Sequence, residues 1–329
     1  MMYNYDDNVK ELNEIAKVPR EDIFSYEHSP IQDVYHRYFQ FCQENLTEAS
    51  EEHAIQPAKF YYRNEYGINA RAGMLNGYFI IGVNMQTIHS LYQLFYEQND
   101  TFETDEYLTK TYGELNEMFD VPAGHLMFQM ATLFTFYHER AHLIQKSPNL
   151  SLGFSEQLDD SIQKQSIIER HILELDADLD AAHQICFHLI DYWKKLNLED
   201  QTQANIQKIL SIGVSSIFSY FLKYFKEVVK VYYDQYTHPR TIRITYIVDC
   251  FIPVAEINLP NGIQLDSRTT LREGFVISET LFKNAGQPSL VEDFVSEFMT
   301  EGLNIDNYVN RLLGVAEGIP TLVKNRHRN

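Results

Sequence analysis

Residues 124–145 read GHLMFQMATLFTFYHERAHLIQ, and this stretch decides the fold. The part before the pentad, which includes Leu126, Met130 and Phe134, is apolar enough to predict a helix buried in the core rather than one lying on the surface. Ser147 and Pro148 follow and predict the end of this helix. We therefore expect a mainly α (α+β) fold built around one long buried helix.

The pentad HERAH near the end of this stretch places His138 and His142 four residues apart, on one face of the helix. Two imidazoles at this spacing can hold one Zn²⁺, with Glu139 beside the water that the ion would bind. A chain with 12 histidines can also contain such a pattern by chance. The pentad therefore predicts a catalytic zinc site only if a third ligand is found.

The best source of a third ligand is the segment 165–184, QSIIERHILELDADLDAAHQ, which has the apolar period of a helix. Glu174 and Asp178 are one turn apart on it and face the same direction. We predict Glu174 as the metal ligand and Asp178 as the acceptor of a ring N–H from a liganding histidine. His171, three residues before Glu174, is an alternative ligand, whereas Asp176 is rotated away.

The two segments together resemble the HExxH and ExxAD motifs of gluzincin metallopeptidases, in which a second helix supplies a glutamate ligand. The metzincin pattern HExxHxxGxxH does not fit, because LIQKSP follows His142. The resemblance implies a zincin-like helical core with a small β-hairpin or sheet beside the active-site cleft. It also implies a peptide or protein substrate.

A third segment, YTHPRTIRI at 236–244, is similar to the His-Pro segment of the gluzincin group that contains CAAX prenyl endopeptidases and heat-shock membrane proteases. The resemblance implies that His238, or a tyrosine such as Tyr236, donates to the oxyanion, and that Arg243 orders the substrate or Glu139. The spacing from Pro239 to Arg243 is one residue shorter than in that group. His238 before Pro239 is also typical of an ordinary helix start.

The function that these motifs predict is hydrolysis of peptide bonds by a metal-activated water, with Glu139 as the general base. A weaker resemblance in size and motif, to phage-exclusion peptidases of the Lit type, suggests one intracellular target in defence or stress. The alternative from another class is a non-catalytic protein, either a helical core stapled by zinc or an interaction module. Glu139 argues against a structural site, which usually fills all four ligand positions.

Composition limits the classes of partner and the location that we expect for this protein. The net charge of −19 argues against a nucleic-acid partner held through phosphates. Three widely spaced cysteines and a polar amino-terminal segment without a signal-peptide core predict a cytoplasmic protein. The most apolar run, 209–222, is too short to span a membrane and predicts a buried helix.

The remaining pattern predicts one peptidase domain over 1–329, with a helical extension at 1–55, a catalytic core at 56–252 and a helical region at 253–329. Residues 68–83 predict a β-hairpin, because Asn76-Gly77 suits a type I′ turn between β-rich segments. An edge strand of this hairpin is a candidate for pairing with an extended substrate. We also predict a helix from Pro239 to about Cys250, and short helices between Leu290 and Val315.

Overall fold

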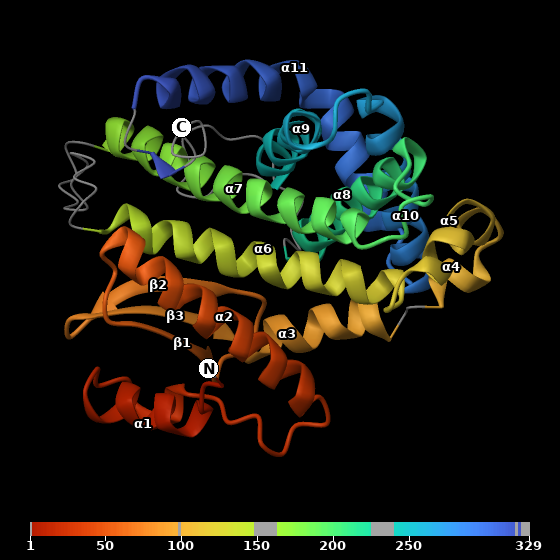
Figure 1. The fold of residues 1–329 in the computed structure, drawn as a ribbon. Helices are drawn as coiled ribbons and strands as arrows, with labels where there is room; N and C mark the ends of the chain where they lie inside the picture. The colour runs from red at the N-terminus through yellow and green to blue at the C-terminus, as the bar shows by residue number, and fades with distance from the viewer. Residues whose placement is uncertain (1, 98–99, 148–162, 225–239, 320–321, 324–329) are drawn as a thin grey trace. The chain divides into compact units, whose positions relative to one another are not determined.

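The computed structural model describes residues 2–97, 100–147, 163–224, 240–319 and 322–323 (Figure 1). Within these ranges the chain is mainly helical with one small three-stranded sheet, which confirms the predicted fold class. The chain divides into two compact units, described separately below: Met1–Ser90 with Thr135–Gln157 and Pro320–Asn329, and Leu91–Phe134 with Leu158–Ile319. The predicted boundaries at 55 and 252 stay a prediction.

The first unit combines a small sheet with helices. Its strands and helices are α1 (Tyr5–Glu14), the 3₁₀ turn η1 (Arg20–Asp22), α2 (Gln32–His53), β1 (Ala58–Arg63), β2 (Ala70–Leu75), β3 (Tyr78–Asn84) and α3 (Met85–Leu91). The last part of α6 (Ala123–Gln145), from Thr135 onward, also belongs to this unit. The side chain of Asn4 caps α1 by accepting from the backbone N–H groups of Asp6 and Asp7.

The predicted hairpin is present as β2 and β3, which pair antiparallel with Leu75 opposite Tyr78. Asn76 and Gly77 form the turn with φ of 48° and 82°, the positive values that a type I′ turn needs. The sheet has the order β1-β3-β2, with β1 parallel to β3. The sequence did not predict β1. Because β3 is central, β2 is the hairpin strand that forms a sheet edge.

The other edge of the sheet, β1, is closed by side chains from the helices. The backbone N–H of Phe60 donates to Gln43 of α2, and its carbonyl accepts from Asn8 of α1. The backbone N–H of Tyr62 donates to the hydroxyl of Tyr5. These bonds satisfy groups that an incoming strand would otherwise use. Among the residues that the structure describes, β2 is therefore the sheet edge that no further strand covers.

Four tyrosines, Tyr5, Tyr26, Tyr35 and Tyr62, form an aromatic cluster beside β1, with ring centroids 4.7 to 5.8 Å apart. All four are buried. Burial raises the pKa of Tyr26 to about 12, and it also raises the pKa values of the other three above the ordinary value. Their hydroxyls therefore keep their protons up to a higher pH in the folded protein than in the unfolded chain.

We expect this cluster to make the protein sensitive to alkali. In the unfolded chain tyrosine loses its proton near pH 10. Above that pH the unfolded state binds fewer protons than the folded state, so the free energy of unfolding falls as the pH rises toward the folded pKa values. Urea unfolding followed by circular dichroism between pH 8 and about 11.5 measures this slope. Tyr26→Phe removes one of the groups and should give a shallower slope; an equal slope would contradict the assignment.

The described residues of the second unit form helices joined by turns and loops, without a strand. Its elements are the π-helical turn η2 (Tyr92–Tyr96), α4 (Thr101–Thr104), α5 (Glu106–Met118), the first part of α6, α7 (Gln163–Lys194), α8 (Gln203–Tyr224), α9 (Arg240–Asn258), α10 (Ser267–Asn284) and α11 (Ser289–Glu317). Helix α8 packs against α7 and α10, and α7 also packs against α9. Gly213 permits the close approach of α8 to α7, because a Cβ there would lie 2.2 Å from Leu189 Cδ1.

The apolar run at 209–222 lies in α8 and is buried along its whole length, which confirms the prediction of a core helix. Among the helices that the structure describes, none has the length and apolar character needed to cross a membrane.

Two helices in this unit differ from prediction. Helix α9 continues through Pro253 to Asn258, beyond the predicted end at Cys250. A proline removes one helical hydrogen bond, but buried side chains on both sides, such as Ile252 and Ala255, hold the helix together. Residues 289–317 form the single helix α11 rather than several short ones, anchored by a buried stripe that includes Phe294, Ile305 and Leu312.

Candidate metal centre

Helix α6 carries the pentad in its last turns. Here Phe136 is fully buried against Phe41 and Phe60 of the first unit. Arg140 is buried, and its guanidinium donates to Asn45 Oδ1 of α2 at 2.8 Å. This arginine therefore helps to hold α6 in place. The end of the helix is held by the Ser147 hydroxyl, which donates to the carbonyl of His53 at 2.5 Å. These contacts give the two histidines a fixed helical frame.

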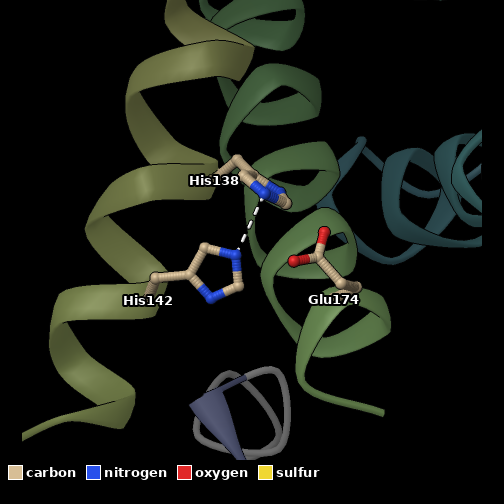
Figure 2. A group of neighbouring side chains, drawn as sticks. All are labelled: His138, His142 and Glu174. Atoms are coloured by element: carbon tan, nitrogen blue, oxygen red, sulfur yellow. Dashed lines mark hydrogen bonds between the residues drawn. The ribbon is translucent and has the colours of Figure 1, made fainter. Parts of the chain in front are cut away.

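The structure brings His138, His142 and Glu174 together (Figure 2). Each offers one ligand atom, and these atoms all lie within 4.8 Å of one another. The Nε2 atoms of His138 and His142 face each other at 3.1 Å. All three residues are half-buried. The group can hold a metal ion, and it consists of the three ligands that the sequence predicted.

The donor geometry fits a small ion with nitrogen and oxygen ligands. Zinc binds imidazole nitrogen at 2.0–2.1 Å in a tetrahedral arrangement, which places two such nitrogens about 3.3 Å apart. The separation of 3.1 Å between the two Nε2 atoms is close to this value. Glu174 keeps 36% of its side chain exposed, so its carboxylate has room to adjust. Two imidazoles and one carboxylate are also ligands that zinc prefers.

Glu139 lies between the two histidines in the sequence and is 8% exposed. Among the residues that the structure describes, its carboxylate has no hydrogen-bond or ion-pair partner. A buried glutamate without a structural partner on the ligand-bearing turn of α6 is available for proton transfer. Its role as the general base stays a prediction.

A residue that the sequence analysis missed is Gln145, the last residue of α6. Its Oε1 lies 2.8 Å from Nδ1 of His142, and the residue is 92% buried. The sequence spacing could have indicated this contact, because Gln145 follows His142 by three residues and residues three apart on a helix are neighbours. The sequence predicts the orienting role for Asp178 alone.

Asp178 of α7 is fully buried and is held by two residues of α9. The Arg243 guanidinium donates twice to its carboxylate, from Nε to Oδ2 at 2.8 Å and from Nη2 to Oδ1 at 2.6 Å. The Tyr246 hydroxyl donates to Oδ2 at 2.5 Å. The predicted hydrogen bond from a liganding histidine to Asp178 stays a prediction.

Arg243 also approaches the ligand carboxylate, with Nη2 3.7 Å from Glu174 Oε2. Burial alone would lower the pKa of Arg243, but the Asp178 carboxylate and its hydrogen bonds outweigh this and raise the pKa well above its ordinary value. Burial and the Asp178 carboxylate likewise raise the pKa of Tyr246. Arg243 therefore stays charged, Tyr246 keeps its proton, and Asp178 accepts from both.

The other predicted site residues have separate outcomes. His171, the alternative ligand, is buried and hydrogen-bonded through Nδ1 to the hydroxyl of Tyr308, so Glu174 takes the place beside the histidines. Arg243 contacts the acidic side chains of α7, a partner that the sequence did not predict. His238 and Tyr236 lie outside the described residues.

Comparison of this chain with models of protein families, with curated proteins and with solved structures finds no match.

Proposed function

We propose that this protein is a zinc-dependent metallopeptidase. The observation that supports the proposal most directly is the meeting of His138, His142 and Glu174 within 4.8 Å, on two helices that match the spacing of the gluzincin motifs. When bound, zinc supplies a Lewis acid that polarises a carbonyl and lowers the pKa of a coordinated water. His138, His142 and Glu174 are the residues that would hold it.

The chain's own groups then move the protons. Glu139 accepts a proton from the attacking water and returns it to the leaving amine, a role suited to a buried carboxylate without a structural partner. Arg243 holds Asp178 and lies beside Glu174, so it positions the ligand carboxylate and balances its charge. The proposed oxyanion donors remain His238 and Tyr236.

The free edge of β2 supports a peptide as substrate. Leu75 and Tyr78 close a two-residue turn and so exchange hydrogen bonds, which turns the backbone groups of Ala72 and Met74 outward. The Lys146 ammonium, directly after α6, donates to the outward carbonyl of Ala72 at 3.3 Å. An extended peptide could pair with these groups by adding a strand. The closed β1 edge offers no such place.

The proposal is tested by metal content and by metal removal. We expect the purified protein to contain about one zinc ion per chain, as a three-ligand catalytic site predicts, and to cleave a synthetic library of unstructured peptides. Treatment with 1,10-phenanthroline should abolish cleavage, and added zinc should restore it. His142→Ala should lose both the zinc and the cleavage.

The outcomes separate the two classes of function. Stoichiometric zinc without cleavage of any peptide would favour the non-catalytic protein with a structural zinc site. Absence of zinc from the wild-type protein, together with no binding of added zinc, would reject both.

A further inference from the structure

We propose that Gln145 is a positioning residue that sets the tautomer and orientation of His142 for metal binding. This inference rests on the metal site of the proposed function, but it concerns binding of the ion rather than cleavage of a peptide. Gln145 Oε1 lies 2.8 Å from Nδ1 of His142. Nothing in the HExxH pattern itself requires a glutamine at this place.

The chemistry of the contact determines which ring nitrogen carries the proton. The amide oxygen of Gln145 can only accept a hydrogen bond, so Nδ1 of His142 is the protonated donor. A neutral imidazole with its proton on Nδ1 presents a lone pair on Nε2. That atom lies 3.1 Å from Nε2 of His138. The two Nε2 atoms are the ones that would bind the ion together with Glu174.

The surroundings of Gln145 make it a rigid partner. It is 92% buried and stands directly before the turn that ends α6. That turn is closed by the backbone N–H of Ser147, which donates to the Ile144 carbonyl at 3.0 Å. Since few side-chain conformations are open to Gln145, it holds the imidazole ring without a further loss of entropy when the ion binds.

The same helix offers a matched control. Gln129 lies four residues after His125 and contacts it through the two Nε2 atoms at 3.2 Å. Neither residue belongs to the group of metal ligands. Replacing Gln129 removes a His–Gln contact of α6 but leaves the proposed metal ligands unchanged.

The experiment measures zinc affinity by competition with a chromophoric chelator, in wild-type protein and in three variants. Gln145→Leu keeps the volume and removes the acceptor, and we expect it to weaken zinc binding about 10- to 100-fold. Gln145→Glu keeps an acceptor and adds negative charge, so it should bind zinc at least as tightly as the wild type. Gln129→Leu should leave the affinity unchanged.

A second readout separates positioning from a merely structural role. The ¹⁵N spectrum of the metal-free wild-type protein should show His142 protonated on Nδ1, and Gln145→Leu should lose this preference while its unfolding temperature without metal stays within a few degrees of the wild type. If Gln145→Leu folds poorly, Gln145→Met replaces it in both measurements.

Three results would overturn the inference: wild-type affinity in Gln145→Leu, an equal loss in Gln145→Glu, or a proton on Nε2 of His142. The proposed function fails differently, through a wild-type protein that binds zinc and cleaves no peptide. In that case Gln145 would still position a ligand of a structural zinc site, and the affinity differences would remain.

Discussion

Glu139→Gln should reduce peptide cleavage by roughly 10²- to 10⁴-fold or more while zinc stays bound. The amide has nearly the shape of the carboxylate but cannot accept a proton from water at neutral pH. No described residue depends on Glu139 for a hydrogen bond or an ion pair, so the substitution leaves the scaffold intact. Turnover number and zinc content measured on the same preparation show both effects.

The matched control for this prediction is Glu117→Gln. Glu117 is exposed on α5 and has no partner among the described residues, so the same chemical change there should leave turnover and zinc content unchanged. A Glu139→Gln protein that cleaves as well as the wild type would exclude Glu139 as the general base. A variant that loses its zinc would indicate instead a role in holding the ion.

Arg243→Met should destabilise the second unit by about 3–5 kcal/mol, because it leaves the buried Asp178 carboxylate without its cation. Asp178 is fully buried, and Arg243 supplies two of its three described hydrogen bonds. The guanidinium carbon now lies 4.9 Å from the centroid of the Phe221 ring, and the methionine thioether can contact this ring in its place. Urea unfolding in the presence of a chelator measures this loss without a contribution from bound metal.

A double variant tests whether the loss comes from the unpaired charge. Asp178→Asn with Arg243→Met removes both charges and keeps an acceptor for Tyr246, so it should recover most of the stability that Arg243→Met loses. The control is Lys194→Met, which breaks the ion pair between Lys194 and Asp191. The side chains of these two residues are 53% and 62% exposed. This variant should change the free energy of unfolding by less than about 0.5 kcal/mol. An Arg243→Met variant as stable as Lys194→Met would show that the buried pair contributes little.

Local patterns carried much of the prediction. The apolar run before His138 indicated a buried helix, and the spacing within HERAH and ELDAD placed each ligand on a particular face. The Asn76-Gly77 turn indicated a hairpin. Each of these depends on residues close together in the chain, where helical and strand periods decide which side chains are neighbours.

Other features depended on contacts between distant segments. The parallel strand β1 and the closing of its edge by Asn8 and Gln43 join parts of the chain that no local period connects. The same holds for the partner of Asp178, since Arg243 reaches it from another helix. Helix α9 continues through Pro253 because the packing of its buried side chains outweighs the loss of one helical hydrogen bond.

The sequence by itself determined the chemical types and helical spacing of His138, His142 and Glu174, because a helix repeats every 3.6 residues whatever surrounds it. Only the tertiary structure decided that Glu174 rather than His171 joins the histidines, because His171 is occupied by Tyr308. It also decided that Arg243 holds Asp178 and that, among the described residues, no further strand covers β2. These choices follow from which buried polar groups find partners, and pairing of that kind is settled by packing in three dimensions.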